Sequence, residues 1–262
     1  MFYWIYDYPS AIVAAFFAFA FVAATWLGIY LLRPTIRSWI HTDQRANDMV
    51  GFALSSFSVL YGLLLGLLAV ASYQNYTTVT DIVDKEAANV AALYRDVSGY
   101  PQPIRRQLEH HLREYARVTI EEAWPQQRRG VVPKAGSHQA AALFATLMTF
   151  QPTQKSEEIL HAETLRQFNN FVEIRRARLV NVSSGIPAAL WWVVALGSLL
   201  NIGLIWMLDM EIHLHVLLGG ALACFLGAVI FIIAAMDNPF RGAVSVGPEA
   251  FQLVYESFLK PE

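Results

Sequence analysis

The sequence is poor in cysteine and in charged residues. It has one cysteine, Cys224, which excludes a disulfide framework and any cysteine-rich metal site. A formal net charge of −2 with no dominant basic stripe gives no indication of nucleic-acid binding. Charged residues make up 15% of the chain, whereas roughly 25% is usual in soluble domains. Because the charges fall in blocks, the uncharged stretches between them indicate membrane spans.

Motifs of common enzyme sites are also missing. The sequence has no nucleophile elbow, no glycine-rich phosphate loop and no paired-carboxylate motif. Its histidine pairs, His110 with His111 and His213 with His215, lack the HExxH pattern and the i, i+4 spacing of a helical metal site. We interpret them as interfacial residues. The sequence therefore predicts no enzyme activity, no cofactor and no metal centre.

Long hydrophobic runs are the main positive feature. About 20 apolar residues are needed to cross a hydrocarbon core of ~30 Å. Four uncharged runs meet this length: residues 9–32, 50–73, 186–208 and 212–236. The first run is too long for a signal peptide, and the leader before it has no Lys or Arg. We expect a protein that crosses the lipid bilayer four times.

A polar block, residues 74–185, separates the two pairs of spans and holds most of the 19 Lys and Arg residues. Apolar side chains recur in it every three to four residues, and no strand alternation persists, so the prediction is an all-α protein. No proline interrupts Val50 to Ser98, which favours one continuous helix. A later helix is expected to end at Pro125. Another is expected to begin with Ser156 as its N-cap and to lead almost directly into the third span.

The predicted organisation is thus a first transmembrane hairpin (1–73), a helical extramembrane block (74–185), a second hairpin (186–236) and a tail (237–262). More basic residues lie near the span ends on the side of the block than on the opposite side. Under the positive-inside rule this favours a cytoplasmic block with both termini inside. The opposite orientation is the alternative, because the block is longer than the ~60 residues to which the rule applies. The residues compared are Lys85, Arg175, Arg176, Arg178 and Arg241 against Arg33, Arg37 and Arg45.

Small and hydroxyl-bearing residues form a stripe along the second span. Their spacing of three or four keeps them near one face of a helix. One interpretation is a pore-lining surface, in which hydroxyls replace water around an ion. The other is plain helix packing, because Gly62-Leu-Leu-Leu-Gly66 is a small-xxx-small pattern. The stripe consists of Ser55, Ser58, Gly62, Gly66, Ala69, Tyr73 and Tyr76.

Three acidic residues, Asp81, Asp84 and Glu86, follow the stripe on the same helix. In a symmetric ring they would recur once per subunit and attract cations into a vestibule. The alternative is an ordinary solvated helix surface. Glu86 begins the alanine-rich segment "EAANVAALYR", which would permit a pairing with Arg95 or with an arginine of another helix.

The turn after the fourth span, "MDNPFRG", has the residues of a membrane exit. Asp237 and Asn238 can cap freed backbone groups, and Pro239 cannot continue a helix. Phe240 is expected to act as an interfacial anchor. Arg241 is expected where phosphates or a helix C-terminus would attract it.

Four segments carry a resemblance to a known family: "FSVLYGLLLGLLAVASYQNY", "EAANVAALYRDV", "REYARVTIEEAWPQQRRG" and "DNPFRGAVSV". They are similar to those of bacterial bestrophin-like membrane proteins. The order of the elements also resembles that of the bestrophin channels: two spans, a helical block continuous with them, two more spans and an Asn-Pro-Phe turn.

The resemblance implies a homo-oligomer, a pentamer in bestrophins, that conducts inorganic ions, mostly anions, along its second span. It implies a pore-lining role for the stripe, although the bestrophin neck is lined by bulky apolar residues. Calcium-gated bestrophins have an acidic run after the turn, whereas Glu249 is the only acid in "RGAVSVGPEAF". A calcium gate of that type is not expected. The alternative function is a non-conducting anchor or sensor whose helical block binds a partner.

Overall fold

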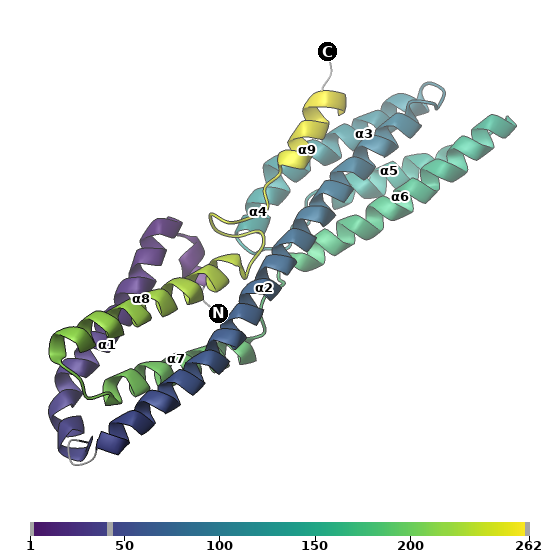
Figure 1. Ribbon diagram of the computed structural model, residues 1–262. Helices are drawn as coiled ribbons and strands as arrows, with labels where there is room; N and C mark the ends of the chain where they lie inside the picture. Colours follow the sequence, from purple (N-terminus) through teal and green to yellow (C-terminus); the bar gives the residue numbers. More distant parts are fainter. Residues whose placement is uncertain (1–2, 41–43, 260–262) are drawn as a thin grey trace. The chain divides into compact units, whose positions relative to one another are not determined.

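The computed structural model describes residues 3–40 and 44–259. Residues 1–2 and 41–43 of the first predicted hairpin, and residues 260–262 of the predicted tail, lie outside the described part. Within the described ranges all regular structure is helical (Figure 1), which confirms the predicted all-α class. The α-helices are α1 (Ser10–Ile40), α2 (Gln44–Val97), α3 (Ile104–Val118), α4 (Trp124–Arg128), α5 (Ser137–Thr149), α6 (Lys155–Asn181), α7 (Ala188–Met207), α8 (Ile212–Met236) and α9 (Glu249–Val254).

Four helices, α1, α2, α7 and α8, are long and apolar enough to cross a membrane. Each overlaps or contains one of the four predicted runs, and α8 has the bounds of the fourth. The continuous second helix is confirmed as well, since α2 runs unbroken from Gln44 to Val97. The chain forms two compact units. The membrane unit comprises Met1–Gln74 and Gly185–Asp237, and the helical unit comprises Asn75–Ser184 and Asn238–Glu262.

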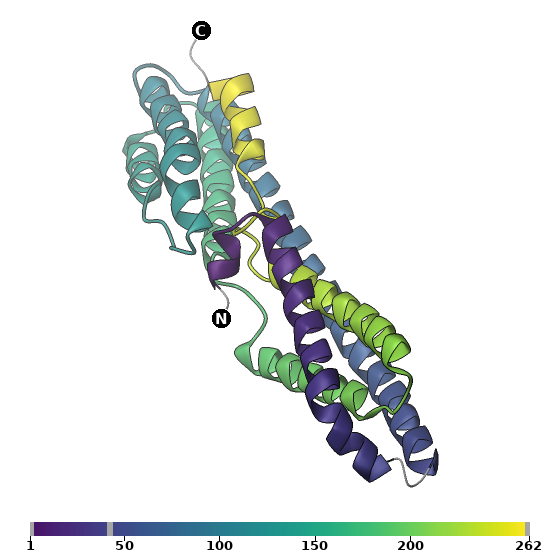
Figure 2. The same cartoon turned by 90° about the vertical axis from the view of Figure 1, so that its left-hand side faces the viewer.

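In the membrane unit, α1 lies beside α8 (Figure 1 and Figure 2). The contact is close because α8 presents glycines to α1. A Cβ atom on Gly227 would lie 2.9 Å from the carbonyl oxygen of Phe17, and one on Gly220 would lie 2.7 Å from Nε1 of Trp26. Small residues permit this approach of two backbones, which is a common basis of helix association in membranes.

Polar contacts join the turn between α7 and α8 to the end of α1 and the start of α2. Arg37 Nε lies 3.1 Å from Oδ1 of Asp209. The side-chain oxygen of Asn47 accepts a bond from the Asp209 N–H at 2.9 Å, and its amide nitrogen donates to the Asp209 carbonyl at 3.2 Å. Arg33 donates to the carbonyl of Met210 at 3.2 Å. These contacts therefore hold the α7–α8 turn against the end of α1 and the start of α2.

The helical unit has its own apolar core. Buried side chains come from the C-terminal half of α2 and from α3, α5, α6 and α9, with Leu93, Leu108, Leu147, Phe171 and Phe251 at its centre. Apolar positions spaced three or four apart on each helix meet there, as the periodicity predicted.

The structure corrects the predicted helix end at Pro125. After α3 the chain makes a π-helical turn over Thr119–Ala123 and continues as α4 through Pro125 to Arg128. Proline is tolerated in the first turn of a helix, because its missing N–H would have no intrahelical partner there. The helix ends before Gly130, whose positive φ of 73° suits glycine.

The predicted N-cap at Ser156 is also wrong. α6 begins at Lys155 with Gln154 as N-cap, and the Glu157 carboxylate accepts bonds from the Gln154 and Thr153 N–H groups at 3.3 and 2.7 Å. This reciprocal capping box satisfies free donors of the first turn. At its other end α6 stops at Asn181, and residues 182–187 before α7 are not helical.

The turn after α8 differs from the predicted membrane exit. Phe240 is 1% exposed in the core of the helical unit, where its ring lies 5.9 Å from that of Trp124. Arg241 is also buried, close to Gly130. The bond from Val246 N–H to the Pro239 carbonyl, at 2.7 Å, closes this loop. Phe240 is therefore a core residue rather than an interfacial anchor, because burial against aromatic rings removes more of its surface from water.

Candidate functional site

The predicted stripe on α2 divides into two edges. Ser55, Gly62, Gly66 and Tyr73 are exposed. Its other members, Ser58, Ala69 and Tyr76, are half-buried. Tyr76 belongs to the helical unit and packs against its core, whereas the other six lie in the membrane unit.

The adjacent face of α2 is held against α7 by polar groups. The Tyr61 hydroxyl donates to the Val194 carbonyl at 2.7 Å and lies 2.9 Å from the Ser198 hydroxyl. One turn away, the Asn201 amide nitrogen donates to the Ser58 hydroxyl at 3.0 Å. The Tyr61 ring covers Gly197, where a Cβ atom would lie 2.3 Å from it. Polar groups inside a membrane are costly unless bonded, so these contacts fix how α2 packs on α7.

The glycines of the stripe have no such neighbours. A Cβ atom on Gly62 or Gly66 would meet nothing within 4 Å among the described residues. Packing within one chain therefore does not explain why these positions are glycine. The small-xxx-small pattern is then explained either by packing against a neighbouring chain or by an open path beside α2.

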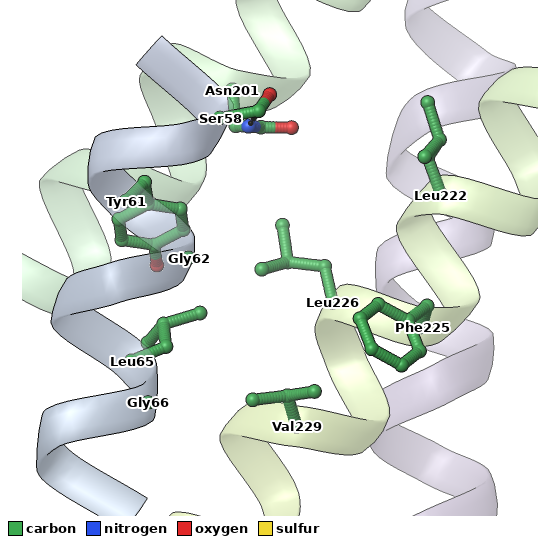
Figure 3. A pocket seen from close by; sticks show the side chains of 10 residues that line it. All are labelled: Ser58, Tyr61, Gly62, Leu65, Gly66, Asn201, Leu222, Phe225, Leu226 and Val229. Atoms are coloured by element: carbon green, nitrogen blue, oxygen red, sulfur yellow. Dashed lines mark hydrogen bonds between the residues drawn. The ribbon is translucent and has the colours of Figure 1, made fainter. Parts of the chain in front are cut away.

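A pocket of about 420 Å³ lies between α2, α7 and α8. Figure 3 shows α2 on one side and α8 on the other, with the polar ends of Ser58 and Asn201 at one end of the space. The lining residues are Ser58, Tyr61, Gly62, Leu65, Gly66, Asn201, Leu222, Phe225, Leu226 and Val229. Three residues of the stripe, Ser58, Gly62 and Gly66, thus line one pocket. Sequence reasoning missed Tyr61 and Asn201, although a polar side chain inside a span is itself a signal.

A second uncovered face of α2 carries bulky apolar side chains. Val59, Leu63 and Val70 are 72%, 62% and 53% exposed. At about 100° per residue they lie next to the exposed edge of the stripe, on the side away from Tyr61. In one chain, α2 therefore leaves both a small-residue surface and a bulky apolar surface uncovered.

The three predicted vestibule acids have different surroundings. Asp81 is exposed and forms an ion pair with Lys85 at 2.5 Å. Asp84 is exposed and lines a pocket of about 380 Å³ in the helical unit, together with Tyr76, Ser245 and Glu249. Glu86 faces the opposite way and is fully buried.

The prediction that Glu86 is a vestibule charge is therefore wrong. Its carboxylate accepts bonds from Nε and Nη2 of Arg178 at 2.6 and 3.1 Å, and another from the Tyr115 hydroxyl. Arg178 also donates to the side-chain oxygen of Gln127 at 2.8 Å. The suggested partner Arg95 is exposed beside Asp96 instead. Since the charge of Glu86 is neutralised inside the core, it cannot act on ions in a vestibule.

Aromatic rings surround this buried ion pair. The Arg178 guanidinium lies 5.4 Å from the Trp124 ring and 5.8 Å from the Phe251 ring, within range of cation–π attraction. Burial, and after it the negative charge of Glu86, raises the pKa of Tyr115, so its hydroxyl stays protonated and donates to the carboxylate. α2, α3, α4 and α6 meet in this network.

The histidine pairs form no metal site in the described chain, where no group of three or more His, Cys, Asp or Glu residues could hold an ion. His213 is exposed. His215 is buried, and its Nε2 lies 2.9 Å from the carbonyl oxygen of Ile205. It is thus a packing residue rather than an interfacial one.

The chain was compared with known proteins. A bestrophin-like domain family model matches residues 19–251. The fold is similar to that of a bacterial bestrophin homologue from Klebsiella pneumoniae, with a TM-score of 0.67, 12% identity, and coverage of 92% of this chain and 96% of that one. Two single-residue variants of that homologue have TM-scores of 0.67 and 0.65 at 11% and 12% identity. They cover 91% and 94% of this chain and 96% and 99% of theirs.

No curated protein sequence matches the chain. The family match nevertheless covers both pairs of spans and the helical region between them. At this low identity the solved structures show the fold, which in the described part of this chain is all-helical with four candidate membrane helices. The chain therefore belongs to the bestrophin-like family of membrane proteins.

Proposed function

We propose that the protein is an oligomeric ion channel in which α2 lines the conducting path. Bestrophins are ion channels, and membership of the bestrophin-like family supports a channel-like function. The observation that carries the proposal is the open surface of α2 at Gly62 and Gly66. In a ring of subunits, an uncovered helix face is available to line a central path.

The path-lining residues we propose are those of the stripe in the membrane unit: Ser55, Ser58, Gly62, Gly66, Ala69 and Tyr73. Tyr76, Asp81 and Asp84 would follow at the entrance. The bulky face with Val59 and Leu63 would then contact a neighbouring subunit. The assembly would be a homo-oligomer, a pentamer by analogy with bestrophins, in a bacterial inner membrane.

Reconstitution between asymmetric salt solutions tests conduction. We expect a protein-dependent current that falls strongly when Gly66 is replaced by Trp, because the added ring would fill the open surface. Leu67→Trp is the matched control. Leu67 follows Gly66 in the sequence but lies about 100° further around the helix, on the side of the bulky face that is away from the stripe, so this variant should pass current. Absence of current from the wild-type protein would refute the channel.

Cysteine substitution tests which face of α2 lies on the path. Ser55→Cys and Gly66→Cys should react with a small aqueous thiol reagent and lose current, whereas Val59→Cys and Leu63→Cys should react slowly. The reverse pattern would assign the path to the bulky apolar face and the stripe to subunit packing.

A non-conducting anchor or sensor is the second candidate. The observation in its favour is that the predicted spans contain no charged residue, although transport paths often use some. In that case substitutions at Gly62 and Gly66 would change assembly on size-exclusion chromatography, and no variant would alter an ion current.

A further inference from the structure

We propose that the pocket between α2, α7 and α8 binds a neutral amphiphile with an apolar chain and one hydroxyl donor. Since Ser58, Gly62 and Gly66 also belong to the proposed path, a bound molecule would occupy part of that surface. The volume of about 420 Å³ lies within the range of small-molecule sites. Leu222, Phe225, Leu226 and Val229 of α8 form one wall, and α2 forms the other (Figure 3).

The polar end of the pocket defines the head group. Asn201 is 9% exposed, and its amide nitrogen is occupied by the bond to Ser58. Among the described residues none donates a hydrogen bond to the amide oxygen of Asn201. Figure 3 shows the oxygens of Ser58 and Asn201 turned toward the open space. An acceptor in an apolar surrounding is stabilised by a donor from the ligand.

The absence of charge in the described lining narrows the class of ligand. No Lys, Arg, Asp or Glu lines the pocket. A phosphate or carboxylate would have no cation to bind, and an amine would have no carboxylate. A bare acyl chain would fill the apolar part but would leave the Asn201 oxygen unbonded. A long-chain alcohol satisfies both parts of the site.

The glycines explain why there is room. Gly62 and Gly66 leave the α2 wall flat, because a Cβ atom at either position would enter free space. A Cβ atom at Gly66 would meet no described neighbour within 4 Å, so a larger side chain there is expected to extend into the pocket. This makes Gly66→Leu a variant that should fold and yet exclude the ligand.

Photolabelling of the full chain in lipid vesicles tests the site with an octanol that carries a diazirine. We expect saturable labelling of the α8 segment around Phe225, prevented by excess octanol. Gly66→Leu should reduce it at least tenfold, while Gly203→Leu should not, since Gly203 also faces open space but lies outside the lining. Asn201→Leu should weaken the apparent affinity about tenfold, as loss of one hydrogen bond implies.

Three results would overturn the proposal. Equal labelling and competition by a diazirine-bearing octane would identify the occupant as a lipid acyl chain. Non-saturable labelling spread over the lipid-facing helices would show that there is no site. Labelling that occurs in dissociated protein and disappears on assembly would show that a second copy of the chain fills the pocket. Photolabelling does not depend on conduction. A protein that is labelled by the alcohol but passes no current would therefore refute the proposed channel and not the binding site.

Discussion

Arg178 is a positive charge in the core of the helical unit, where an unpaired cation would be very unfavourable. The carboxylate of Glu86, the Gln127 oxygen and two aromatic faces together replace the water it has lost. Removing one partner would leave another buried polar group without its bond, because each partner is buried along with the charge. The residues involved are therefore expected to respond strongly to substitution.

Replacing Glu86 by Gln should lower the free energy of unfolding by about 3–5 kcal/mol, since it leaves the guanidinium buried without a counter-ion. Asp81→Asn is the matched control, because it removes an exposed partner of Lys85 and should cost no more than about 1 kcal/mol. Denaturant unfolding of both variants in detergent measures the difference. Equal stability of the two would contradict the role assigned to the buried pair.

The Tyr115 hydroxyl predicts a dependence on alkaline pH. Its folded pKa is raised, so the unfolded chain loses this proton first, above about pH 10. The folded state then binds more protons, and stability falls as pH rises, by up to about 1.4 kcal/mol per pH unit. Tyr115→Phe should be less stable at pH 8 and should lose less stability than wild type between pH 9 and 11. Parallel curves for the two proteins would show that the hydroxyl does not titrate on unfolding.

At the scale of elements, hydrophobic length was sufficient to locate the spans. A 25-residue uncharged run such as α8 is long enough to cross the bilayer, so composition alone was sufficient to predict its bounds. Helix ends were harder, because competing side chains decide them: Glu157 caps α6 at Gln154 although Ser156 is near. Pro125 was misread because proline is compatible with a first turn as well as with a helix end.

The site was only partly predictable for a related reason. The spacing of Ser55 to Tyr73 placed them on one face, but helical periodicity cannot tell what that face meets. Whether Glu86 is exposed or buried depends on where α3, α4 and α6 pack, and those contacts join residues up to 92 positions apart. Asn201 was visible in the sequence as a polar residue in a span, yet its partner on α2 was not.

The packing of α1 on α8 predicts a large effect of one methyl group. Gly227→Ala should lower the free energy of unfolding by about 1–3 kcal/mol, because the new Cβ would press on the Phe17 backbone at 2.9 Å. Gly203→Ala, in α7 with nothing within 4 Å, should be neutral or slightly stabilising through its better helix propensity. Thermal unfolding in the same detergent compares them. A neutral Gly227→Ala would mean that the two helices can separate at no cost.

At the scale of the whole molecule, four spans and one long polar region set the topology. Since the described residues hold four candidate spans, an even number, we expect the helical unit and the segment before α1 on one side of the membrane, and the turns around Arg37 and Asp209 on the other. The excess of basic residues near the helical unit predicts that its side is the cytoplasm. Two of the three basic residues counted on the opposite side already have partners within the protein: Arg33 donates to the Met210 carbonyl, and Arg37 pairs with Asp209.

Thiol labelling in intact bacterial cells measures this orientation. In a Cys224→Ala background, Ser38→Cys and Lys134→Cys each place one exposed thiol on opposite sides of the predicted membrane. A membrane-impermeant maleimide should label Ser38→Cys in spheroplasts and Lys134→Cys only after lysis, because the reagent cannot reach the cytoplasm. The background protein should remain unlabelled in both conditions. Labelling of Lys134→Cys alone in intact spheroplasts would place the helical unit outside, and would show that the charges on the long polar region do not direct insertion.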